Sequence, residues 1–204
     1  MSAETAEELA RHAAKKAKQK SARDRMLAKR QGEKGLLLVH TGTGKGKTTA
    51  AIGLILRALG NGMRVALVQF VKGRWPSGER VALERFAELL TVKVMGEGFT
   101  WETQDRARDR AAAERAWAAS ATFLTDPAVE LVVLDELNIV LRDGVLPLDA
   151  VLEALAKRPA RQHVVITGRN APPALIEAAD LVTEMTLVKH PFRAGIKAQR
   201  GIEF

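Results

Sequence analysis

Residues 36–53 read "LLLVHTGTGKGKTTAAIG", and this stretch decides the fold. The apolar run 36–40 has the character of a buried strand, and an Ala/Leu/Ile-rich helical pattern runs from Thr48 to Leu59. Between them lies a turn with three glycines and two lysines. Such a turn lets backbone N–H groups and a helix N-terminus surround an anion. We predict a nucleotide-phosphate site formed by Gly42, Thr43, Gly44, Lys45, Gly46, Lys47, Thr48 and Thr49.

The turn departs from the usual phosphate-binding pattern at one position. That pattern is G-x-x-x-x-G-K-[ST], and the chain has Thr41 in place of its first glycine. Gly42 and Gly44 can supply the tight curvature instead, and Lys47 follows Gly46 as the pattern requires. Lys45 is open to two interpretations, a phosphate contact or a solvated side chain.

Strand and helix patterns alternate along the rest of the chain. Expected strands are 64–70, 91–95, 129–136 and 163–168, and expected helices are 79–90, 104–124 and 147–158. Strands that are apolar throughout and separated by helices indicate a parallel sheet covered on both faces. The expected fold class is therefore α/β, with a mostly parallel sheet covered by helices on both faces, as in the RecA-like P-loop NTPase fold.

A second motif, "LVVLDE" at 131–136, ends in two carboxylates. Ligands of such sheets lie at the carboxyl ends of the strands, where a terminal carboxylate holds Mg²⁺ directly or through water. Thr48, Asp135 and Glu136 are the predicted metal-side residues. Glu136 has three possible roles: it can activate water, bind the metal, or serve as a charge at a helix start.

The composition of the chain excludes some types of site and restricts the expected compartment and partners. The chain has no cysteine, so disulfides and thiolate metal sites are excluded, and no apolar run is long enough to span a bilayer. We expect a cytoplasmic protein. Of the net charge of +8, +5 falls in residues 1–34. The expected organisation is a basic N-terminal arm (1–34), helical or partly disordered, and a P-loop domain (35–204). The arm is either a solvated extension or a helix that docks on a partner subunit or over a ligand.

Two large rings, Phe99 and Trp101, lie in the glycine-flanked loop "MGEGFTWETQ" at 95–104. In a chain that is only 4% aromatic they have two interpretations. They either cap the core or form a flat apolar platform for a planar ligand. Trp75 lies in a second loop that follows a strand.

Taken together, these motifs resemble the P-loop ATP:corrinoid adenosyltransferases. The resemblance covers about Gly35 to Phe204. It includes "TGTGKGKTTAA", "VQFVKGRWPSGER", "GFTWETQ", "VVLDELN", "VITGRNAP" and the C-terminal "VKHPFRAGIKAQRGIEF". It implies transfer of the 5′-deoxyadenosyl group of ATP to the cobalt(I) of a corrinoid, with release of tripolyphosphate, in adenosylcobalamin biosynthesis or salvage. The loop with Thr41 is similar to that of the family.

The resemblance also implies roles and partners. Lys47, Phe99 and Trp101 become catalytic candidates, and the two rings are expected to displace the lower axial ligand of the corrinoid. Mg²⁺ is the implied cofactor, with ATP and a corrinoid as substrates. The partners implied are an external electron donor such as a reduced flavoprotein and a second subunit in a homodimer, and we expect neither a membrane nor nucleic acid as partner.

Two other classes fit the phosphate-binding turn alone. A RecA-like ATPase that remodels nucleic acid would use the positive charge, but most of that charge is in one arm. A kinase would need an acceptor site, for which the sequence has no distinct motif. The expected products separate them, since DNA-stimulated phosphate release indicates the first class and ADP the second.

Overall fold

The computed structural model describes residues 5–30, 32–71, 78–95 and 106–203, and its centre is a six-stranded sheet. The order across the sheet is β3-β2-β4-β5-β1-β6, and all five pairings are parallel. The strands are β1 (Leu37–Thr41), β2 (Val65–Gln69), β3 (Leu90–Val94), β4 (Leu131–Asp135), β5 (His163–Thr167) and β6 (Leu181–Glu184). The strand order places β5 between β1 and β4, the strands that carry the two motifs.

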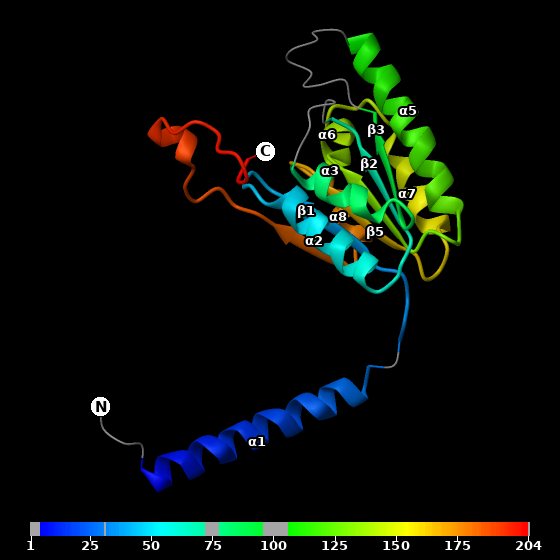
Figure 1. Ribbon diagram of the computed structural model, residues 1–204. Helices are drawn as coiled ribbons and strands as arrows, with labels where there is room; N and C mark the ends of the chain where they lie inside the picture. Colours follow the sequence, from blue (N-terminus) through cyan, green and yellow to red (C-terminus); the bar gives the residue numbers. More distant parts are fainter. Residues whose placement is uncertain (1–4, 31, 72–77, 96–105, 204) are drawn as a thin grey trace. The chain divides into compact units, whose positions relative to one another are not determined.

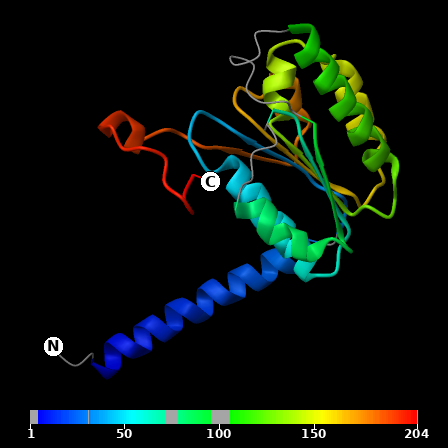
Figure 2. The same ribbon diagram turned by 45° about the horizontal axis from the view of Figure 1, so that its top comes forward.

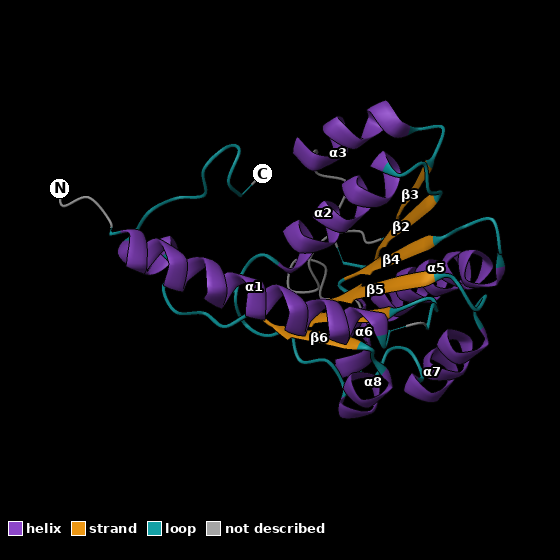
Figure 3. Cartoon of the chain, turned by 90° about the horizontal axis from the view of Figure 1, so that it is seen from below, coloured by secondary structure: helices purple, strands orange, loops and turns teal. Residues whose placement is uncertain are grey.

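Helices cover both faces of this sheet (Figures 1 and 3). One face carries α2 (Lys47–Gly60), α3 (Gly78–Leu83) and the 3-10 turn η1 (Glu84–Phe86). The other carries α5 (Arg106–Thr125), α6 (Leu137–Arg142), α7 (Leu148–Lys157) and α8 (Pro173–Ala178). The predicted α/β class, with a parallel sheet between two helical layers in the RecA-like manner, is confirmed.

Alternate strand residues build two separate cores, as the two-residue period of a strand requires. Val39, Val132 and Ile166 pack with α5, α6, α7 and α8. Leu67 and Val133 pack with α2 and α3 on the opposite face. Burial on both faces explains why these strands read as continuous apolar runs. The rigid sheet then fixes the loops at its carboxyl edge.

Several elements differ from the sequence prediction. The helix expected over 79–90 is shorter, because α3 ends at Leu83, a 3-10 turn follows and β3 begins at Leu90. The strand β6 and the six-residue helices α6 and α8 were not predicted. All four residues of β6 are exposed, so this edge strand lacks the apolar pattern by which the others were recognised.

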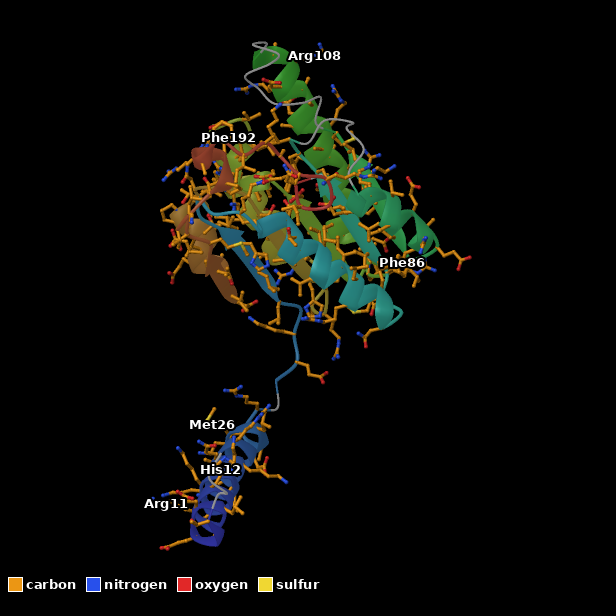
Figure 4. All side chains as sticks on the ribbon, turned by 60° about the vertical axis from the view of Figure 1, so that its left-hand side comes forward. Arg11, His12, Met26, Phe86, Arg108 and Phe192 are labelled. Carbon is orange, nitrogen blue, oxygen red and sulfur yellow. The ribbon has the colours of Figure 1, made fainter. Side chains whose placement is uncertain are left out.

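Residues 1–33 form a separate unit from residues 34–204. Its helix α1 (Ala6–Ala28) begins with a capping box, in which Thr5 and Glu8 each bind the other's backbone N–H. Figure 4 shows its long side chains, among them Arg11, His12 and Met26, pointing outward, and Met26 is 57% exposed. The helix therefore buries no core of its own.

The C-terminal segment, residues 187–203, follows β6 and carries the 3-10 turn η2 (Pro191–Ala194). It exposes large apolar side chains, including Val188 at 90% and Phe192 at 78% (Figure 4). In Figures 1 and 2 the end of the chain lies beside the start of α2. In the described part of the chain, no helix combines the length and the apolar character needed to cross a bilayer.

Candidate nucleotide-binding site

The glycine-rich turn is a tight loop at the carboxyl end of β1, and it rests on the backbone that follows β6. Gly42 and Gly46 have φ of +93° and +106°, in the left-handed region that favours glycine. The Gly44 N–H donates to the Met185 carbonyl over 2.6 Å. A Cβ at Gly42 would lie 2.4 Å from that same carbonyl oxygen. These glycines are therefore required by backbone packing as well as by any phosphate.

Thr41 shows why the first glycine of the pattern is dispensable here. It is the last residue of β1 and is buried, and its hydroxyl accepts a hydrogen bond from the Ala171 N–H at 3.1 Å. Positive φ begins at Gly42, one residue later. A side chain at position 41 thus ties the loop to the segment after β5 without strain.

Lys47 is the first residue of α2, its side chain reaches back to the loop, and it is only 6% exposed. Its ammonium donates to the carbonyls of Gly42 at 2.8 Å and Gly44 at 2.6 Å. Burial lowers the pKa of Lys47, the nearby carboxylate of Glu136 opposes this shift, and the positive charge of Arg169 adds to it. The lysine closes the loop on itself and is close to both an acidic and a basic group.

The second lysine has a different partner. Lys45 forms an ion pair with Glu203, near the end of the chain, and its side chain is 55% exposed. Thr43 and Thr49, also predicted as phosphate-binding residues, are exposed at the same turn. The exposed side of the loop therefore carries Lys45, whose charge is compensated by the C-terminal segment.

Asp135 connects the polar side chains of the site. It is fully buried at the end of β4, and its carboxylate accepts three hydrogen bonds. Thr48 donates to Oδ1 at 2.9 Å, Thr167 donates to Oδ1 at 2.7 Å, and Gln69 donates to Oδ2 at 3.0 Å. Three donors compensate the cost of burying this group. The hydrogen bond from Thr48 brings the two sequence motifs together, as predicted from their places at strand ends.

A row of polar side chains crosses the sheet beneath the loop. The strand registers align Gln69 with Asp135, and His40 with both Thr167 and Thr183. His40 is 6% exposed, and neither ring nitrogen has a hydrogen-bond partner within the described residues. Burial lowers the pKa of His40, so its neutral form is favoured.

Glu136 starts α6 in an unusual backbone conformation, with φ of +65°. Its N–H donates to the Thr167 hydroxyl at 2.9 Å, so the threonine links both acidic residues. Glu136 lies near the loop, since its negative charge acts on the pKa of Lys47. Of its three possible roles, the N-terminal position of α6 is observed, and the other two remain proposals.

The oxygen donors here suit a hard cation. Thr48, Asp135 and Glu136 offer a hydroxyl and two carboxylates, the donor type that Mg²⁺ prefers. Among the described residues no group of three or more His, Cys, Asp or Glu side chains gathers into a metal cluster. In nucleotide sites Mg²⁺ binds one or two carboxylates and takes its remaining ligands from phosphate and water.

The structure adds residues that lie outside the phosphate loop and the motif at 131–136. Gln69 and Thr167 bind Asp135, and Arg169 lies near Lys47. In the sequence, each of these residues can be recognised as a polar residue at the end of an apolar strand or just beyond it. Phe99 and Trp101, like Trp75, lie outside the described residues.

Comparison with known proteins identifies the family. The profile described as ATP:corrinoid adenosyltransferase BtuR/CobO/CobP matches residues 33–204. This chain belongs to that family. A corrinoid adenosyltransferase of Pseudomonas aeruginosa is 56% identical over 201 residues, which cover 98% of this chain and 99% of that protein.

Further relatives carry the same description. A corrinoid adenosyltransferase of Sinorhizobium sp is 52% identical, covering 96% of this chain and 92% of that protein. The corrinoid adenosyltransferase CobA of Salmonella typhimurium is 48% identical, covering 89% of this chain and 91% of that protein. The family profile spans the whole P-loop unit of this family member.

Proposed function

We propose that this protein transfers the 5′-deoxyadenosyl group of ATP to the cobalt(I) of a corrinoid. Membership of the adenosyltransferase family carries this proposal, and the phosphate loop joined to Asp135 supports it. Cobalt(I) supplies the electron pair for the new cobalt–C5′ bond and becomes cobalt(III). The C5′–O bond breaks, and its electron pair leaves with tripolyphosphate. The product belongs to adenosylcobalamin biosynthesis or salvage.

The phosphate loop acts on the leaving group. Lys47 turns from the carbonyls of Gly42 and Gly44 toward the triphosphate, whose charge it offsets. Backbone N–H groups at the start of α2 hold the phosphates and align C5′ with cobalt. Thr48 and Asp135, with Glu136 beside them, would hold Mg²⁺, which would neutralise further charge on the triphosphate.

The corrinoid side of the reaction rests on the family resemblance. We assign Phe99 and Trp101 to the lower face of the corrinoid, where they displace the axial ligand and ease reduction of cobalt(II). The chain has no cysteine, and we infer an external electron donor such as a reduced flavoprotein. A cytoplasmic homodimer is the proposed setting.

The products of the reaction test this function. With ATP, Mg²⁺ and chemically reduced cobalamin, the protein should form a photolabile adenosylcorrinoid and one tripolyphosphate per turnover, measured by absorbance and by phosphorus NMR. Release of orthophosphate or ADP without an adenosylcorrinoid would contradict it, and DNA-stimulated phosphate release would point to a nucleic-acid ATPase.

A variant pair tests the aromatic residues. Phe99→Ala and Trp101→Ala should reduce turnover from cobalt(II) with a protein reductant far more than turnover from pre-reduced cobalt(I). The reason is that only the first assay needs loss of the axial ligand. Trp117→Ala, in α5 and packed against the core, is the control for general loss of packing. Equal losses in both assays would indicate a role in packing or in substrate binding instead.

A further inference from the structure

Arg169 lies on a short loop that is fixed against the phosphate loop. The loop joins β5 to α8 and runs beside the end of β1. The Gly168 N–H donates to the His40 carbonyl at 3.2 Å, and the Ala171 N–H donates to the Thr41 hydroxyl at 3.1 Å. Gly168, directly before Arg169, and Ala171, two residues after it, are thus bound to His40 and Thr41, the two residues that precede Gly42.

The same loop is held on its other side by the start of α6. Buried Asn138 donates from Nδ2 to the Gly168 carbonyl at 3.0 Å. A Cβ at Gly168 would lie 3.2 Å from the Glu136 carboxylate, so this backbone is close to the proposed metal side. Gly168 and Asn170 have φ of +130° and +54°. Two residues with positive φ flank Arg169 and give this loop a defined backbone shape.

The charge of Arg169 is not compensated by the protein. Its side chain is exposed, and within the described ranges no carboxylate pairs with it. By contrast, the exposed cations Lys34, Lys45 and Lys157 each have an acidic partner. Arg169 is also close enough to Lys47 for the two positive charges to act on each other. Two cations that repel each other at a phosphate loop are stabilised by a bound polyanion.

We propose that Arg169 is a further phosphate-binding residue, which holds the triphosphate chain of ATP and then the tripolyphosphate leaving group. This inference rests on the proposed function and names a residue outside both motifs. The planar guanidinium can bind two phosphate oxygens at once, which an ammonium cannot do. Arg169 thereby stabilises charge on the departing oxygen chain and fixes the position of C5′, while the C5′–O bond breaks as described above.

Binding measurements with separate parts of the substrate test this role. Arg169→Ala should weaken binding of Mg-tripolyphosphate and of ATP about tenfold or more, as expected for charged hydrogen bonds. Binding of adenosine, which has no phosphates, should stay unchanged. Arg169→Lys should fall between wild type and Arg169→Ala, because it keeps the charge and loses the two-pronged contact.

The matched control is Arg57→Ala, which removes an equal charge from the last turn of α2. Arg57 lines a groove with Leu36 and His163 at the other end of the sheet, and its removal should change none of the three affinities. Wild-type affinities for tripolyphosphate and ATP in Arg169→Ala would overturn the inference. So would a raised KM for the corrinoid alone, which would place Arg169 on the other substrate. Wild-type protein that binds ATP yet forms no adenosylcorrinoid would overturn the proposed function instead.

Discussion

His40 lies in the polar row beneath the phosphate loop, where its imidazole is buried. Neither ring nitrogen has a hydrogen-bond partner among the described residues. Its neighbours in the row, Thr167 and Asp135, satisfy each other. A buried polar group that lacks a partner costs about 1–3 kcal/mol of folding free energy. The buried imidazole therefore lowers the folding stability of the protein next to the candidate nucleotide site. Such a cost is expected where the needs of function limit stability.

His40→Leu should increase the free energy of unfolding by about 1–3 kcal/mol at pH 8, because the apolar side chain needs no partner. Denaturant unfolding followed by circular dichroism measures this. His12→Leu, at an exposed position of α1, is the control and should leave the P-loop unit unchanged. A loss of stability in His40→Leu would show that the imidazole has a partner in solution, such as a buried water.

The pH dependence of stability gives a second measurement on the same variant. Burial lowers the pKa of His40 from its ordinary value of 6.5. As the pH falls through 6.5, the unfolded chain binds a proton that the folded chain does not, so wild type loses stability. His40→Leu should lose less stability between pH 7 and pH 5. Equal slopes for the two proteins would contradict the burial of a neutral imidazole.

At the scale of elements, the phosphate loop depends on its contact with the segment after β6. A Cβ at Gly44 would lie 2.7 Å from the Thr186 carbonyl oxygen and 2.8 Å from that of Met185. Gly44→Ala should therefore displace the loop, lower stability by about 1–3 kcal/mol and weaken ATP binding. Thermal unfolding and calorimetric titration with ATP measure the two effects.

The matched control is Gly53→Ala, which lies in α2, the helix that follows the loop directly. A Cβ at Gly53, inside α2, meets no atom within 4 Å. This variant should be more stable by about 0.5–1 kcal/mol, because alanine is the better helix former, and should bind ATP normally. Similar behaviour of the two variants would show that the loop tolerates a side chain and rests loosely on residues 185–186.

The elements that sequence patterns predicted are those buried on both faces. The strands β1, β2, β4 and β5 are apolar because helices cover both sides of them, and α2 follows directly from Gly-Lys-Thr. The strand β6 was missed because its residues are exposed, and among the described strands its one partner is β1. The spacing of apolar residues in a sequence reflects which side chains are buried, so an exposed edge strand has little recognisable pattern.

In the candidate site, too, some residues could be predicted from the sequence and others could not. Lys47, Thr48 and Asp135 were predictable because local motifs contain them. Gln69 and Thr167 bind Asp135 through strand register, across 66 and 32 residues of chain respectively. No local pattern records such pairings. The sequence therefore predicted the ligand class, whereas the supporting hydrogen bonds required the fold.

At the scale of the whole molecule, residues 1–33 and 34–204 are separate units. A chain that begins at Lys34 should keep its melting temperature within about 2 °C, a change below about 1 kcal/mol, because the arm contributes no core. Its far-UV helical signal should fall by the 23 residues of α1. A melting temperature lower by more than about 5 °C would show that the arm packs on the P-loop unit.

The end of the chain lies at the phosphate loop, where Glu203 pairs with Lys45 across 158 residues of sequence. The pair occupies Lys45, which has two interpretations from the sequence, a phosphate contact or a solvated side chain. Within the described part of the chain, the apolar side chains of this segment are largely exposed, as Val188, Phe192 and Ile202 show. A phosphate contact of Lys45 would make the triphosphate of ATP compete with this carboxylate for the ammonium, since both are negative.

Glu203→Gln should therefore bind ATP more tightly than wild type, by up to about fivefold at low salt, since exposed ion pairs contribute up to about 1 kcal/mol. Salt screens exposed charges, so the gain should shrink as salt is added. Glu153→Gln removes the same charge from an exposed pair with Lys157 on α7 and should leave ATP binding unchanged. Calorimetric titrations at two salt concentrations measure these affinities. Weaker ATP binding in Glu203→Gln would instead show that the carboxylate holds Lys45 in place for the phosphates.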